Sequence, residues 1–200
     1  STTVAGTATW PGAALEKITL TARDFPDGVQ FDRIAEDPAQ PDGAGAPPPM
    51  VTRPPGCSNG MTNVIAKSAE RGPGSASRYG VAYDGARIMM TVLSWNLDLD
   101  LLSATASKCE HFETFFDPQS AGIPITTTQL PAADGVLLYR QTMELGGANN
   151  SVYMAFANVG TRAVFGVVFP TEDPSIPVKA TLPQTSTDTV DRQVARVRTA

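Results

Sequence analysis

Six short apolar segments, most of them followed by a turn that contains glycine, dominate the chain between residues 76 and 169. Residues 76–83 and 87–95 are joined by Asp84-Gly85, a dipeptide that strongly favours a two-residue hairpin. The other four segments are 123–130, 135–145, 151–158 and 162–169. Strands joined by such short turns must pair antiparallel, because a parallel pair needs a long crossover. The last segment is apolar on both faces, which predicts a central place in the sheet.

Helices are expected at three places around these strands. Apolar residues recur at helical spacing over 57–69, and again in a segment that begins at Asp98 and ends at Asp117-Pro118. The apolar stripe of this second helix would consist of Leu102, Ala106, Cys109, Phe112 and Phe116. A final helix near the end of the chain has one apolar side, formed by Val190, Val194 and Val197.

The remaining segments complete an α+β fold. A further strand is expected at about 28–34, and the proline-rich segment 37–55 is expected to form a long surface loop, because proline removes a hydrogen-bond donor. No βαβ alternation is visible, so the helices are expected to pack on an antiparallel sheet of about 5–7 strands. Two hundred residues fit a single domain. We predict a flexible tether over 1–14 and one domain over 15–200.

Charge and hydropathy argue against nucleic-acid binding and against a segment that spans a membrane. The net charge is −5, and the 15 basic residues form no stripe of the kind that nucleic-acid binding requires. No apolar run reaches the roughly 18–20 residues of a membrane span. The small, Thr-rich residues 1–9 resemble the tether of an exported lipoprotein, whose acylated cysteine would lie just before Ser1. An ordinary flexible terminus is the alternative.

The two cysteines, Cys57 and Cys109, are the most informative pair of residues. Each lies on the apolar stripe of a predicted helix, and both helices are expected to pack on the same sheet. In an oxidising compartment such a pair is most simply a disulfide. Two buried thiols, or one reactive nucleophile, are the alternatives. Nucleophilic chemistry is poorly supported, because His111, two residues from Cys109, would point to a different side of a helix.

The chain lacks the residue sets that enzymes of familiar types require. His111 is its only histidine, which excludes a multi-histidine zinc site and is more typical of a solvated surface residue. No Gly-x-Ser-x-Gly elbow, phosphate-binding glycine loop or EF-hand loop is present. We therefore predict no catalytic residue, no metal and no cofactor.

Aromatic and arginine residues on the predicted strands are the candidates for a binding cleft. Core packing explains most of these aromatic side chains. The alternative is an apolar cleft between sheet and loops in which hydroxyls and guanidinium groups orient a ligand. The candidate ligand-binding residues are Arg87, Trp95, Tyr139, Arg140 and Tyr153.

The order of features resembles a known group of proteins. Pro54-Pro55-Gly56-Cys57 opens a helix, a hairpin follows over 78–95, and Ser107-Lys108-Cys109 lies on the next helix before four strands and a terminal helix. This order is similar to the PknH-type extracellular sensor domains of mycobacterial receptor kinases and to allied exported lipoproteins. The likeness covers about 25–198 and is most specific over 54–112. PknH-type sensors carry two disulfides, whereas two cysteines permit only one.

The resemblance implies an extracytoplasmic, cell-envelope domain with a groove. The expected function is that of a non-enzymatic lipoprotein or ectodomain that binds a small or amphiphilic ligand, or a protein of the envelope. A structural or antigen-like interaction module without a small-molecule site is the alternative, and an enzyme is the least expected.

Overall fold

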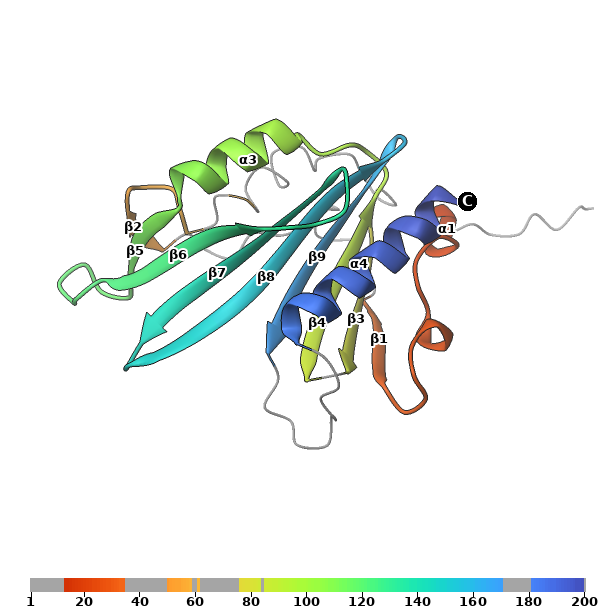
Figure 1. Ribbon diagram of the computed structural model, residues 1–200, viewed down its shortest axis with the longest axis horizontal. Coiled ribbons are helices and arrows are strands. Elements are labelled where there is room, and N and C mark those ends of the chain that lie inside the picture. Colours follow the sequence, from red (N-terminus) through yellow and green to blue (C-terminus); the bar gives the residue numbers. More distant parts are fainter. Residues whose placement is uncertain are drawn as a thin grey trace, which may run out of the picture.

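The computed structural model describes residues 13–34, 50–58, 61, 76–83, 85–170 and 181–199. Within these residues, nine strands form one antiparallel sheet in the order β1-β3-β4-β9-β8-β7-β6-β5-β2 (Figure 1). The strands are β1 (Gln30–Ile34), β2 (Val51–Arg53), β3 (Ala76–Tyr83), β4 (Ala86–Leu93), β5 (His111–Phe115), β6 (Ile123–Leu130), β7 (Val136–Leu145), β8 (Ala148–Val159) and β9 (Arg162–Pro170). The helical segments are α1 (Ala13–Glu16), the 3-10 turn η1 (Ala22–Asp24), α3 (Leu99–Lys108) and α4 (Leu182–Arg198).

Glycine turns set the register of the central hairpins. Tyr83 of β3 pairs with Ala86 of β4, so only two residues connect these strands, and Gly85 has a φ of 71°. The β7–β8 turn uses Gly146 and Gly147, whose φ angles are 61° and 77°. Two consecutive positive φ angles match the twist of antiparallel strands and favour glycine at both positions. These turns confirm the hairpins predicted from the sequence.

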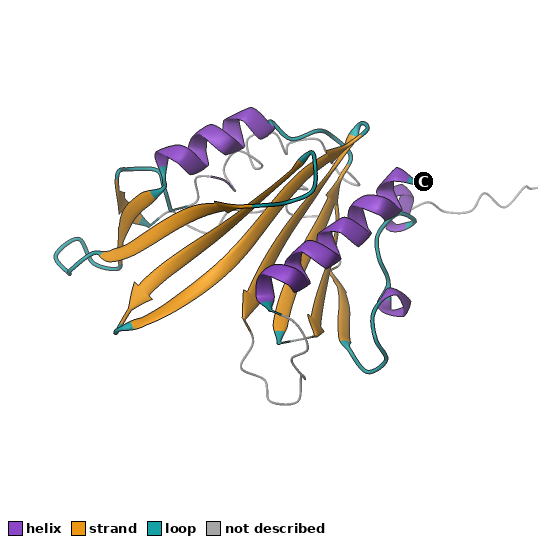
Figure 2. Ribbon diagram, in the orientation of Figure 1, coloured by secondary structure: helices purple, strands orange, loops and turns teal. Residues whose placement is uncertain are grey.

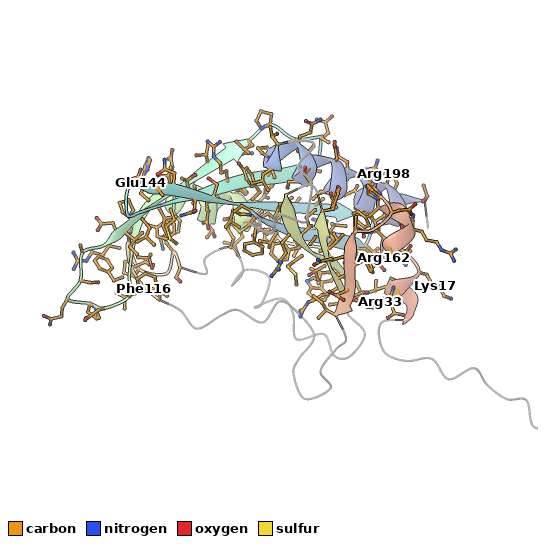
Figure 3. The ribbon with its side chains drawn as sticks, turned by 90° about the horizontal axis from the view of Figure 1, so that it is seen from below. Lys17, Arg33, Phe116, Glu144, Arg162 and Arg198 are labelled. Atoms are coloured by element: carbon orange, nitrogen blue, oxygen red, sulfur yellow. A yellow bond between two sulfur atoms is a disulfide. The ribbon has the colours of Figure 1, made fainter. Side chains whose placement is uncertain are left out.

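Apolar clusters lie on both faces of the sheet, and among the described residues α4 packs against one face and α3 against the other (Figure 2). Because successive side chains of a strand point to opposite faces, Leu138 belongs to one apolar cluster and Tyr139 to the other. Helix α4 covers the first face and contacts β4, β8 and β9. Figure 3 shows the sheet nearly edge-on, with α4 along one side. Helix α3 contributes Leu102 and Ala106 to the second cluster. Strand β9 lies between β4 and β8 and serves both clusters, which confirms its predicted central place.

A buried glutamine joins α4 to the segment before β1. Gln193 is fully buried, and its Oε1 accepts hydrogen bonds from the Tyr79 hydroxyl (2.8 Å) and the Leu20 amide (3.0 Å). Its Nε2 donates to the Ile18 carbonyl at 2.7 Å. Burial raises the pKa of the Tyr79 hydroxyl, which therefore remains a donor. With its hydrogen-bonding groups engaged, Gln193 holds the N-terminal segment against the sheet at little desolvation cost.

An ion pair supports the same junction. Arg196 of α4 binds Asp24, whose carboxylate also accepts a hydrogen bond from the Thr21 amide at 2.7 Å. Burial alone would raise the pKa of Asp24, but the hydrogen bonds and the positive charge of Arg196 together lower it. Arg192 lies over the ring of Phe25, with 5.0 Å between its guanidinium carbon and the ring centroid. The two arginines thus fix the segment that leads into β1.

The α+β class and the antiparallel sheet are confirmed, whereas the predicted number of strands is too small. The helix expected from Asp98 to Asp117 ends at Lys108, and residues 111–115 form β5 instead. Strand β2 lies inside the segment expected to be a loop, because pairing with β5 orders residues 51–53. The helix expected over 57–69 falls outside the described residues except for Cys57, Ser58 and Met61. None of the helices formed by the described residues is long and apolar enough to span a membrane.

Candidate ligand-binding pocket

Helix α3 is fixed to the sheet at its beginning by side-chain hydrogen bonds. Asp98 caps the helix, and its carboxylate accepts a hydrogen bond from the Leu101 amide at 3.0 Å. Asn158 of β8 binds both main-chain groups of Leu97, accepting from the amide at 2.7 Å and donating to the carbonyl at 2.9 Å. Asn96 donates to two carbonyls in the β8–β9 turn region. These contacts determine where α3 starts.

A disulfide fixes the other end of α3. Cys109, the C-cap of the helix, is bonded to Cys57, and the two Cα atoms lie 5.6 Å apart. Both cysteines are buried and pack with Phe112 and the half-buried Ile125. The bond joins the helix end to the segment that follows edge strand β2. The disulfide predicted from the sequence is therefore formed, and neither cysteine is free.

A main-chain hydrogen bond then holds the residue after the disulfide against β6. The Thr127 amide donates to the Glu110 carbonyl at 2.8 Å. Thr127 pairs with Gln141 of β7, and Gln129 pairs with Tyr139. Since directly paired residues share a face of the sheet, these four side chains lie on the α3 side.

A cavity of about 220 Å³ opens between the end of α3 and strands β6 and β7. Its lining residues are Ala106, Ser107, Glu110, Thr127, Thr128, Gln129 and Tyr139. Most of them carry hydroxyl, amide or carboxylate groups. Ser107, Glu110 and Gln129 are exposed, whereas Ala106, Thr127 and Tyr139 are buried.

Tyr139 is the most deeply buried polar residue of this pocket. Only 2% of its surface is exposed, yet its hydroxyl has no hydrogen-bond partner among the residues that the structure describes. Its ring packs against Phe156, with 6.3 Å between the ring centroids. Leaving a buried hydroxyl unpaired costs about 1–3 kcal/mol. A bound molecule that paired with the Tyr139 hydroxyl would recover this energy.

Among the described residues that line the pocket, Glu110 is the one that carries a charge, and it lies at the rim. Its side chain is 65% exposed. The Nε2 atom of His111 lies 3.9 Å from the Glu110 carboxylate, and His111 is itself 75% exposed, in agreement with the surface position expected for it. The pocket thus has a negative, solvated rim and a neutral, buried base.

The structure distributes the five candidate ligand residues over both faces of the sheet. Tyr139 lines the pocket. Trp95 is buried and belongs to the same apolar cluster as Tyr139, on the α3 face of the sheet. Arg140 pairs with Tyr153, which lies in the cluster on the α4 face. Arg87 pairs with Phe169 at the end of β4 and is exposed. Of these five residues, only Tyr139 is part of the pocket, and the role of each in binding stays a prediction.

Sequence reasoning missed the pocket residues supplied by α3 and β6. A usable signal was present in β6, where Ile125, Thr127 and Gln129 alternate on one face. An apolar residue followed on the same face by threonine and glutamine predicts that this face becomes polar toward the end of the strand. Ser107 and Glu110 carried no such signal, because their position depends on where α3 ends.

Comparison with known proteins identifies the fold. No family model matches the sequence, and no curated protein matches it. The extracellular domain of PknH from Mycobacterium tuberculosis superposes with a TM-score of 0.56 and 9% identity, over 92% of this chain and 95% of that one. An uncharacterized protein from Mycobacterium smegmatis, the Rv0999 ortholog, gives a TM-score of 0.55 and 16% identity, over 88% and 92%. The resemblance to the PknH-type sensor is therefore confirmed at the level of the fold.

Proposed function

We propose that this chain is a non-enzymatic, extracytoplasmic ectodomain that binds a small ligand in the pocket beneath α3. The observation that carries the proposal is that Tyr139, a buried residue whose hydroxyl has no hydrogen-bond partner among the described residues, lines a cavity of about 220 Å³. Native proteins pair nearly all of their buried polar groups, and an exception calls for an explanation such as strain or a missing water, ion or ligand. A ligand that hydrogen-bonds to this hydroxyl supplies the missing partner.

Two observations support a location outside the reducing cytosol. The chain forms the Cys57–Cys109 disulfide, and such bonds persist mainly in oxidising compartments. Its fold is also that of the extracellular domain of a receptor kinase. We extend the proposal to a protein of the cell envelope.

The composition of the pocket supports binding rather than catalysis. The described residues that line it include no histidine, cysteine or lysine, and their one carboxylate, on Glu110, is largely exposed, so they offer no buried group of the kind that usually acts as a general acid or base. Among the described residues, no three His, Cys, Asp or Glu side chains gather as metal ligands would. The polar lining also favours a small polar ligand over an amphiphilic one, which would require an apolar wall.

A fragment screen by NMR tests the proposal. Uniformly labelled, oxidised full-length protein is titrated with polar compounds of one ring, and the amide signals are followed. We expect hits to shift the amides of Ser107, Thr127 and Gln129, and to lose affinity in the Tyr139→Phe variant. Tyr83→Phe is the matched control, because it removes a hydroxyl bonded to Thr189 on the other face. Hits that never shift the pocket amides would refute the proposal.

A further inference from the structure

The pocket beneath α3 also indicates the chemical class of its ligand. We propose that it takes a neutral, polyhydroxylated ring about the size of one sugar unit, and that it rejects anions. This inference rests on the proposed function, because it specifies the ligand of the same site. It follows from the volume of the cavity, its hydrogen-bonding groups and the position of its one charge.

The volume limits the ligand to a single substituted ring. A cavity of about 150 Å³ is large enough to hold benzene. The 220 Å³ beneath α3 therefore accommodates one six-membered ring together with several hydroxyl substituents. A chain of sugars or a lipid would extend into solvent beyond the rim.

The hydrogen-bonding groups match a ligand that both donates and accepts. The hydroxyls of Ser107, Thr127 and Tyr139 can each act in either sense, and the amide of Gln129 offers both functions at separate atoms. Thr127 already accepts a hydrogen bond from the Gln141 side-chain amide at 3.2 Å, which leaves its hydroxyl hydrogen available to a ligand. A hydroxyl group on a ligand can both donate hydrogen bonds to these side chains and accept hydrogen bonds from them.

The charge distribution disfavours an anionic ligand. Among the described residues that line the pocket, Glu110 is the one charged group, so a carboxylate or phosphate would meet repulsion at the rim and find no cation among these residues. The Glu110 carboxylate can instead accept hydrogen bonds from two neighbouring hydroxyls of a ring.

A cationic ligand is also less favourable than a neutral one. The carboxylate of Glu110 is largely solvated, so solvent screens its attraction for an ammonium group just as it screens its repulsion of an anion. The base of the pocket, at Tyr139, is neutral and buried, and placing a positive charge there would require desolvation without an anionic partner.

A set of ring compounds tests this assignment on the oxidised full-length chain. The probes are myo-inositol and glucose (neutral), glucuronate (anionic), glucosamine (cationic) and cyclohexanol (largely apolar). Binding is measured by the shifts of the Ser107, Thr127 and Gln129 amides. We expect the two neutral polyols to bind at least tenfold more tightly than each of the other three.

Two variants assign the selectivity to residues. Glu110→Gln is expected to lower the ratio of glucose affinity to glucuronate affinity by up to about fivefold, because it removes a solvent-screened repulsion and keeps the shape of the side chain. Tyr139→Phe is expected to weaken myo-inositol binding about tenfold through the loss of one hydrogen bond. Unchanged ratios in the Glu110→Gln variant would contradict the role given to that carboxylate, even if the Tyr139 variant failed to fold.

The possible failures are distinguishable. Tighter binding of glucuronate, glucosamine or cyclohexanol at the same amides would overturn the ligand class but leave the pocket as the binding site. If none of the five probes shifts these amides, the ligand class is wrong, and the outcome of the broader fragment screen decides whether the proposed function fails with it.

Discussion

Replacing Tyr139 with phenylalanine deletes one buried oxygen atom and leaves the packing of the ring unchanged. The lost hydroxyl has no partner in the ligand-free domain, and the ring contact with Phe156 is retained. An unpaired buried hydroxyl costs about 1–3 kcal/mol, part of which water in the pocket offsets. We therefore expect Tyr139→Phe to stabilise the ligand-free domain by about 1 kcal/mol, or about 2–4 °C in Tm for a chain of this length.

Tyr79→Phe is the comparison variant, because it is expected to lower the free energy of unfolding, whereas Tyr139→Phe is expected to raise it. Tyr79 is also almost fully buried, but its hydroxyl donates to Gln193 at 2.8 Å. Its loss is expected to cost about 0.5–1.5 kcal/mol. Urea unfolding of the wild type and both variants, followed by circular dichroism, gives the two differences in free energy. If Tyr139→Phe destabilises the domain as much as Tyr79→Phe does, the Tyr139 hydroxyl has a partner and the reasoning about the pocket is wrong.

Three further outcomes concern the bonds that hold the helices and the N-terminal segment to the sheet. Replacing Cys57 and Cys109 with alanine opens a loop of sequence separation 52, which is expected to cost about 4 kcal/mol in urea unfolding; a loss below about 1 kcal/mol would contradict this. The pKa of Asp24 is lower in the folded protein than in the unfolded chain, so the unfolded chain binds more protons as the pH falls. The pairing of Asp24 with Arg196 therefore stabilises the fold fully above the ordinary pKa near 4. This stabilisation is lost as the pH falls through the lower pKa of the folded protein. Asp24→Asn should therefore be less stable than the wild type at pH 7, by less than about 1 kcal/mol, with the difference vanishing near pH 2; a constant difference across this range would exclude the linkage. Gln193→Leu leaves three buried groups unpaired and is expected to cost more than about 3 kcal/mol, measured by thermal unfolding; a shift in Tm of under about 3 °C would argue against the network.

The central hairpins could be predicted from the sequence because their signals are local. Asp84-Gly85 and Gly146-Gly147 define turns over a few residues, and strand alternation on either side of them sets the register. The two-sided apolar pattern of β9 likewise predicts its central place without knowledge of its partners.

The residues of β5 are predicted to be helical because their sequence fits both the helical spacing of apolar residues and the alternation of a strand. Leu102, Ala106 and Cys109 follow helical spacing, and Phe112 happens to continue it. The same residues 111–115 also alternate between exposed and buried, and pairing with β2 and β6 decides in favour of the strand. Long-range pairing of this kind outweighs local preference, and one sequence does not reveal it.

The pocket could not be predicted for the same reason. It requires α3 to end at Lys108, the disulfide to place that end beside β6, and the register to bring Gln129 opposite Tyr139. The end of α3 and the position of the disulfide both depend on contacts between segments that are distant in the chain. Of the sequence-derived ligand candidates, Tyr139 reached the pocket, whereas Arg140, one residue further, faces the opposite side.

Successive side chains of β7 point to opposite faces of the sheet, and the two faces have different roles. Gln193 and its partners secure the chain on the α4 side, while the residues that would meet a ligand lie on the other. Substitutions at Gln129 or Ser107 can therefore alter what is recognised without touching the network that maintains the fold. Related domains with very different sequences can in this way keep one architecture and diverge freely in specificity.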